Sequence, residues 1–113
     1  MSAITTHVLD ASRGLPAAGV RVELEQMDAH DQWKPIAQGC TDAQGRLSTL
    51  MPAGAAALPG SYRLLFDTGT YFEAQGIATF YPIVAVSFTV GSDAHYHVPL
   101  LLSPFSYSTY RGS

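Results

Sequence analysis

Residues 95–102 read HYHVPLLL, and this alternation of side chains is typical of a β-strand with two unlike faces. Successive side chains of a strand point to opposite faces. One face therefore carries an apolar row, made of Tyr96, Val98, Leu100 and Leu102. The other face carries His95 and His97, which we expect to point away from the core. This stretch predicts a sheet with a buried apolar face and a second face that bears imidazoles.

The same two-residue period recurs along the chain between clusters of turn residues. In VRVELEQM, for example, Val20, Val22 and Leu24 share one face. Eight segments are expected as strands: 3–10, 20–27, 31–39 (at an edge, because of Pro35), 46–50, 61–67, 83–90, 95–102 and 105–111. Residues 68–76 predict a short helix that Gly76 stops. These segments predict an all-β sandwich, and 113 residues predict a single domain over residues 1–113.

Composition narrows the choice of partners. Charged residues are 13% of the chain, roughly half the usual share, while 47% are apolar. Fewer charges leave more apolar surface to hide, so we expect self-association. The net charge is −3 without a basic cluster, which argues against a nucleic-acid partner. The apolar stretches are broken well short of a membrane span, so no membrane partner is expected.

The N-terminal residues and the single cysteine bear on the compartment. MSAITTHVLD has no basic region followed by an apolar region, so no secretory signal is expected. Cys40 is the one cysteine and cannot form an internal disulfide or a zinc ribbon. Together these features predict a cytoplasmic protein.

Histidine and arginine are the candidate chemical groups. By strand parity, His7 shares a face with Thr5 and Leu9, opposite the apolar Ile4 and Val8. Imidazole titrates near neutrality and can take a proton from water. Arg46 follows a turn at Gly45, where its guanidinium can hold a carbonyl or anionic oxygen, although a solvated side chain is the commoner outcome there. His30 lies in a polar turn and is expected at the surface.

Two histidines at His-x-His spacing, with a third elsewhere, also fit a three-imidazole zinc site. Sheet histidines are more often structural than metal ligands, and no acidic partner lies close in sequence. We therefore expect no metal and keep a zinc-dependent hydrolase using His7, His95 and His97 as an alternative. Loss of activity to a chelator would favour that alternative.

Several motifs taken together resemble a known family. They are THVLD, FDTGTYFEAQG, TFYP, HYHVPLLLSP and YSTYRGS, which cover the chain from residue 4 to residue 113. The chain resembles the 5-hydroxyisourate hydrolases, the transthyretin-related proteins of purine breakdown. The resemblance implies a transthyretin-like sandwich of eight strands in two sheets with one short helix. It also implies a homotetramer, a dimer of dimers, with active sites in a channel between the dimers.

The resemblance implies a reaction as well: cofactor-independent hydrolysis of a cyclic amide bond in 5-hydroxyisourate. The product would be 2-oxo-4-hydroxy-4-carboxy-5-ureidoimidazoline, on the way from urate to allantoin. Matched to this sequence, the family's catalytic residues are His7, Arg46, His97 and Ser113. Its substrate-binding residues are Tyr110, Arg111 and Gly112. His95 precedes the matched motif and is left out of the catalytic set.

These residues suggest a mechanism. His7 and His97 would flank the bound ring, one activating water and the other assisting the departing nitrogen, and the sequence does not say which does which. Arg46 would stabilise the oxyanion. The C-terminal segment would wall the pocket, with the carboxylate of Ser113 near the imidazoles. The main rival is a transthyretin-like carrier that binds small apolar ligands without turnover, because fold alone does not fix function.

Overall fold

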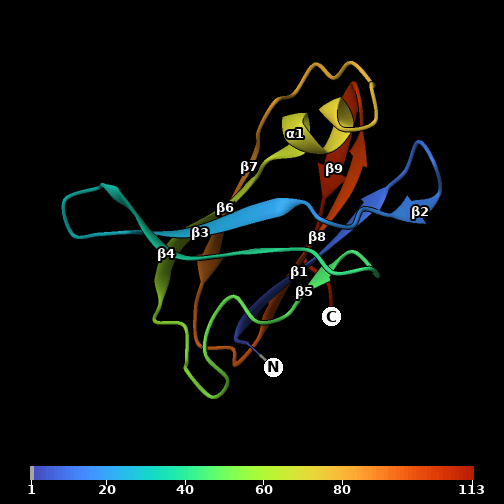
Figure 1. Cartoon of the computed structure of the whole chain (residues 1–113). Helices are drawn as coiled ribbons and strands as arrows, with labels where there is room; N and C mark the ends of the chain where they lie inside the picture. The colour runs from blue at the N-terminus through green and yellow to red at the C-terminus, as the bar shows by residue number, and fades with distance from the viewer. Residues whose placement is uncertain (1) are drawn as a thin grey trace.

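Two β-sheets pack face to face in the computed structural model, which describes residues 2–113 (Figure 1). The described residues form nine strands and one helix. In chain order these are β1 (Ile4–Asp10), β2 (Leu15–Pro16), β3 (Arg21–Met27), β4 (Trp33–Cys40), β5 (Arg46–Leu47), β6 (Gly60–Phe66), α1 (Thr68–Glu73), β7 (Val84–Val90), β8 (Tyr96–Ser103) and β9 (Ser106–Thr109).

Each sheet has a distinct strand order. Sheet A runs β2-β1-β8-β9, and the short β5 also pairs with β1. Sheet B runs β4-β3-β6-β7. All neighbouring pairs are antiparallel except β1 and β8, which run parallel over seven registered residue pairs from Ile4↔Tyr96 to Asp10↔Leu102. The parallel pair is the centre of sheet A, and it carries His7 and His97.

The core lies between the sheets and confirms the predicted faces. From sheet A it takes the apolar rows of β1 and β8, and from sheet B those of β3, β6 and β7. Its fully buried members include Ile4, Val8, Val22, Leu24, Leu64, Phe66, Leu100 and Leu102. Burying one such side chain stabilises the fold by about 1.5–3 kcal/mol. This burial fixes the inner face of sheet A, so the alternate residues of β1 and β8 must face outward.

The strand count differs from the prediction by one short strand. Leu15–Pro16 was expected within a loop, but it pairs with Leu9 and Asp10 at the end of β1. Gly14, at φ 67°, turns the chain back on itself, and its N–H donates to the carbonyl of Asp10. A two-residue strand is too short to show an alternating pattern, and its proline argues against a strand because proline lacks a ladder donor.

The predicted edge strand and helix are both present. β4 lies at the edge of sheet B, and its register with β3 shifts at Leu24/Glu25, opposite Pro35. α1 begins after Asp67, whose side chain accepts from the Thr70 N–H, and it ends at Glu73, before Gly76 at φ 69°. Within residues 2–113, no helix is long and apolar enough to cross a membrane.

Candidate active site

The outer face of sheet A brings the predicted catalytic side chains together through strand register. The parallel pairing of β1 with β8 sets Thr5 beside His97, and the antiparallel pairing of β1 with β5 sets His7 beside Arg46. Paired residues in a sheet project to the same face. Segments from three distant parts of the sequence therefore present imidazole, hydroxyl and guanidinium groups on one surface.

Thr5 links His97 of β8 with His95, which immediately precedes that strand. Its Oγ1 lies 2.7 Å from Nδ1 of His97 and 3.0 Å from Nε2 of His95. The imidazole rings are nearly parallel, with centroids 6.3 Å apart and an interplanar angle of 16°. A hydroxyl has one proton, so Thr5 donates to one imidazole and accepts from the other. Thr5 is only 4% exposed, so the protein itself supplies both of these partners.

His97 is held in its neutral form by its surroundings. Its pKa lies below the ordinary value of 6.5, chiefly because burial disfavours the charged ring. The charges of His95, His7 and Arg46 lower the pKa further. No hydrogen bond engages Nε2 of His97 within residues 2–113. His97 thus offers an unengaged ring nitrogen on a residue that is neutral at neutral pH.

His7 has a defined tautomer when neutral. Its Nε2 lies 3.0 Å from the carbonyl oxygen of Gln44. A carbonyl can only accept, so Nε2 of His7 carries the proton and donates it there. The turn before β5 thereby orients the imidazole and leaves Nδ1 as its other ring nitrogen.

Arg46 is positioned by the turn that precedes β5. Asp42 accepts hydrogen bonds from the N–H groups of Gln44 and Arg46, and Gly45 adopts φ 76°. A side chain at position 45 would also meet the carbonyl of Val8 at 2.4 Å, so only glycine fits. Across the described residues, the guanidinium of Arg46 forms no ion pair. Its donors are therefore free to bind a ligand.

The C-terminal segment reaches the histidines through Gly112. Gly112 forms an isolated bridge with His97, and its N–H donates to the His97 carbonyl at 2.9 Å. A Cβ at Gly112 would lie 2.7 Å from Cδ2 of His97 and 3.1 Å from Cγ of Pro99. Glycine is thus the residue that lets the backbone lie directly on the imidazole. Figure 1 shows the C-terminus next to β1 and β5.

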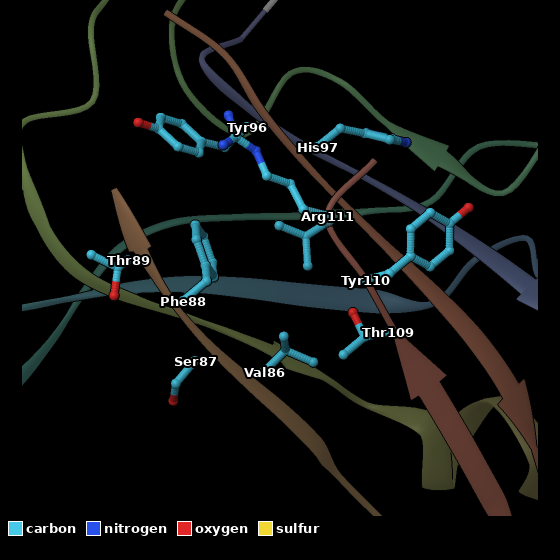
Figure 2. Close-up of a pocket in the computed structure, with 10 residues that line it drawn as sticks. Val86, Ser87, Phe88, Thr89, Tyr96, His97, Thr109, Tyr110 and Arg111 are labelled. Atoms are coloured by element: carbon cyan, nitrogen blue, oxygen red, sulfur yellow. The ribbon is translucent and has the colours of Figure 1, made fainter. Parts of the chain in front are cut away.

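Tyr110 and Arg111 point in different directions (Figure 2). The guanidinium of Arg111 lies 4.6 Å from the ring centroid of Tyr96 and forms a 2.9 Å ion pair with Asp93. In the figure it reaches toward Tyr96, while the exposed Tyr110 ring projects the other way. Both residues line a hollow of about 220 Å³ between β7 and β8, together with His97. Their expected role in substrate binding stays a prediction.

A second hollow, of about 200 Å³, gathers the candidate chemistry. We call it the histidine pocket, and it is lined by Thr5, Thr6, Arg46, Ser48, His95, His97 and Ser113. Its lining contains an arginine and two imidazoles but no Asp or Glu side chain. His7 adjoins it through its pairing with Arg46. The guanidinium of Arg46 makes this pocket suited to a polar ligand that develops negative charge beside it.

The predicted catalytic set leaves out four of these lining residues: Thr5, Thr6, Ser48 and His95. Thr5 was placed on the His7 face by parity, yet a threonine carries no chemical signal of its own. Its role depends on the β1–β8 register, which pattern reading does not supply. His95 was left out of the catalytic set, but it lines the histidine pocket beside His97.

The three histidines do not form a metal centre. Across residues 2–113, no group of three or more His, Cys, Asp or Glu side chains is arranged to hold a metal ion. His95 and His97 direct one ring nitrogen each to Thr5, and His7 directs one to Gln44. The zinc alternative therefore gains no support from this geometry.

Comparisons with known proteins agree with the fold. A 5-hydroxyisourate hydrolase from Salmonella dublin is 49% identical over 111 residues, covering 97% of this chain and 80% of its own. One from Mus musculus is 45% identical, covering 99% and 96%. The solved structure of Klebsiella pneumoniae 5-hydroxyisourate hydrolase is 38% identical, with a TM-score of 0.87 and full coverage of both chains.

A transthyretin is equally similar in fold. Sea bream transthyretin, solved in complex with thyroxine, is 37% identical, with a TM-score of 0.90 and coverage of 97% of this chain and 94% of its own. The model of the HIUase/Transthyretin family matches residues 4–112. The chain therefore belongs to the HIUase/Transthyretin family.

Proposed function

We propose that this protein is a 5-hydroxyisourate hydrolase that opens a cyclic amide of its substrate with water, in the degradation of urate. One observation carries the proposal: His97, His7 and Arg46 converge on one face of sheet A, around a pocket whose lining holds no carboxylate side chain. The curated relatives of the same name, at 45–49% identity over nearly the whole chain, support it. The product is 2-oxo-4-hydroxy-4-carboxy-5-ureidoimidazoline, and the reaction needs no cofactor.

His97 is the general base in this mechanism. Its lowered pKa keeps it neutral at neutral pH, and its Nε2 makes no hydrogen bond to residues 2–113. Water gives a proton to that nitrogen as its oxygen attacks the carbonyl carbon of the ring amide. A positioned base of this kind contributes about 10²–10⁴-fold to the rate.

His7 and Arg46 complete the reaction. When the tetrahedral intermediate collapses, the C–N bond breaks and the departing nitrogen takes the proton that His97 removed from water, so the neutral base is regenerated. His7 orients that nitrogen. Arg46 binds the oxygen on which negative charge develops, and its guanidinium is free to do so because no residue among 2–113 pairs with it.

The C-terminal segment is the wall of this pocket. Gly112 lies on the His97 ring, and Ser113 lines the histidine pocket together with His95 and His97. We assign Ser113 to the catalytic set and Tyr110, Arg111 and Gly112 to substrate binding. A variant lacking residues 110–113 should therefore fold but lose most of its catalysis.

The protein assembles as a homotetramer, a dimer of dimers, in this proposal. β7 and β9 end their sheets, and an open strand edge is a template for pairing with a second copy. Phe80, Ile83 and Phe105 are exposed by 70%, 59% and 69%, respectively. An interface would cover such apolar surface. Light scattering coupled to size exclusion tests the assembly.

The remaining assignments are also proposals. Residues 1–113 form one hydrolase domain, which the family match over residues 4–112 supports. The cytoplasm is the expected compartment, and the free, exposed Cys40 fits a reducing environment. We expect neither nucleic acid nor membrane as a partner.

A non-catalytic carrier is the alternative, because the thyroxine-binding sea bream transthyretin shares the fold. The chemistry of the pocket favours the hydrolase. A carrier of apolar ligands has no need for Arg46 and neutral His97 on one surface, whereas ring hydrolysis needs both a base and an oxyanion partner.

The test follows freshly generated 5-hydroxyisourate by its ultraviolet decay, with and without the purified protein. We expect strong acceleration over spontaneous hydrolysis, and near-baseline rates with His97→Ala and Arg46→Ala. Thyroxine binding is measured in parallel. Tight hormone binding without acceleration by the wild-type protein would overturn the hydrolase assignment. Near-wild-type rates from a folded, tetrameric protein without residues 110–113 would remove only the role of that segment.

A further inference from the structure

We propose that Thr5 and His95 are positioning residues that fix the tautomer of His97, leaving its Nε2 unprotonated toward the histidine pocket. The inference rests on the proposed function, because it concerns how the base of that reaction is prepared. It starts from the two hydrogen bonds of Thr5, to Nδ1 of His97 at 2.7 Å and to Nε2 of His95 at 3.0 Å.

The direction of these hydrogen bonds decides which nitrogen of His97 is basic. Thr5 occupies Nδ1 of His97, so Nε2 is the nitrogen left to meet water. Nε2 accepts a proton only if Nδ1 already carries one, because neutral imidazole has one N–H. Nδ1–H of His97 must then donate to Thr5 Oγ1. The hydroxyl proton of Thr5 in turn donates to Nε2 of His95, and His95 carries its proton on Nδ1.

Burial makes both hydrogen bonds of Thr5 obligatory. Thr5 is 4% exposed, so water cannot readily replace either imidazole as its partner. In the opposite direction, His95 would donate to Thr5 and Thr5 would donate to His97. The proton of neutral His97 would then lie on Nε2, which could not accept a proton from water. The proposed base role of Nε2 of His97 requires the first order, in which His95 is an acceptor and its neutral, Nδ1-protonated form sets the direction of both hydrogen bonds.

The same contacts also hold His97 after it has taken a proton. After Nε2 takes a proton from water, Nδ1–H of the imidazolium still donates to Thr5, so the ring does not turn during the reaction. Gly112 meets the same ring at its Cδ2 edge. The base is thus held by a hydrogen bond on one nitrogen and by the C-terminal backbone, with only Nε2 left for chemistry.

The experiment reads the tautomer directly, by ¹⁵N NMR of the His97 ring nitrogens at a pH well above the pKa of imidazole. Thr5→Val removes the hydroxyl and keeps the shape, whereas Thr5→Ser keeps the hydroxyl. His95→Ala removes the acceptor, whereas His95→Gln supplies an amide oxygen in its place. Thr41→Val is the matched control, since Thr41 is 5% exposed and its hydroxyl also makes two hydrogen bonds, to Val20 and Ala17.

We expect Nδ1–H in the wild type, in Thr5→Ser, in His95→Gln and in Thr41→Val. In His95→Ala the hydroxyl of Thr5 turns to donate to His97, so the proton of His97 moves to Nε2. Thr5→Val gives a mixture of tautomers. Its kcat falls by about 2- to 13-fold, the worth of one hydrogen bond of about 0.5–1.5 kcal/mol, while KM stays close to the wild-type value. Thr5→Ser restores kcat.

Two results would overturn the inference: Nε2–H in the wild-type protein, or a His97 tautomer that neither Thr5→Val nor His95→Ala changes. Both readings are made without substrate. If instead the wild-type protein shows Nδ1–H but does not accelerate 5-hydroxyisourate decay, the hydrogen-bond chain stands and the proposed function fails. The two failures are therefore distinguishable.

Discussion

Replacing Gly112 with alanine places one methyl group against the proposed base. The added Cβ would lie 2.7 Å from Cδ2 and 3.4 Å from Cγ of His97, and 3.1 Å from Cγ of Pro99. Carbon atoms in contact prefer about 3.5–4.0 Å. The imidazole cannot simply retreat, because Thr5 holds its Nδ1 at 2.7 Å. Either the ring leaves Thr5, or the segment that contains Gly112 lifts away from the sheet.

The size of the effect follows from the cost of overpacking. An inserted methyl in a packed site costs about 1–3 kcal/mol. If the whole of this free energy destabilises the catalytic geometry of His97, kcat/KM drops by about 5- to 150-fold. Global stability should change little, because Gly112 lies outside the core and the segment can move as a unit. The loss should therefore appear in activity and not in the thermal midpoint.

The assay is the decay of 5-hydroxyisourate, measured beside a thermal melt for each variant. Gly91→Ala is the matched control: it makes the same chemical change where the new Cβ lies 3.7 Å from the Tyr96 hydroxyl, an ordinary contact. We expect Gly91→Ala to keep both activity and stability. Wild-type kcat/KM in Gly112→Ala would refute the reasoning. So would equal losses in the two variants.

Three further predictions concern the charges around the pocket. Arg46→Ala should lower kcat by about 10²–10³-fold, the loss of one oxyanion donor, in the same decay assay, with Arg46→Lys retaining only part of the rate. In an NMR titration, His97 should titrate below pH 6.5. The unfolded chain then binds more protons than the folded one just below pH 6.5, so the contribution of His97 to stability is lost as pH falls through its folded pKa. The value of kcat/KM should fall over the same range as the pH is lowered. A pKa of His97 at or above 6.5 would contradict the argument that burial lowers it. Asp93→Ala should lower kcat/KM by about 1.4- to 5-fold without changing the melt, because its exposed ion pair anchors Arg111. An unchanged kcat/KM would show that Arg111 does not depend on this anchor.

Strand parity predicted the inner faces of this protein well. The apolar rows of residues 95–102 and 61–67 lie in the core, and His95 and His97 share the opposite face. These predictions succeed because burial of alternate side chains is a local property of a strand. The edge position of β4 followed likewise from Pro35. β2 is not among the predicted strands, because its two residues pair with β1 through the turn at Gly14 and show no alternating pattern of their own.

The composition of the site was harder to predict, since it depends on register between distant strands. Parity could show that His7 and His97 leave the core, but not that β1 and β8 run parallel with Thr5 beside His97. Arg46 has no residue pattern that separates it from a solvated arginine. Only the family resemblance singled it out, and the β1–β5 pairing places it beside His7. The catalytic roles of these residues stay predictions until the assays above are done.

The placement of Arg46 also has two opposed effects that must be weighed together. Its charge helps to lower the pKa of His97, which weakens that imidazole as a base. The lower pKa leaves nearly every His97 ring neutral at cellular pH and therefore able to accept a proton, which partly offsets its weaker basicity. The same charge stabilises the oxyanion that forms as His97 takes the proton. This stabilisation lowers the activation free energy and so offsets part of the effect of the lower pKa. If this balance is correct, Arg46→Gln should raise the pKa of His97 and yet reduce kcat at every pH, whereas an arginine that only tuned the base would leave kcat unchanged on the alkaline side.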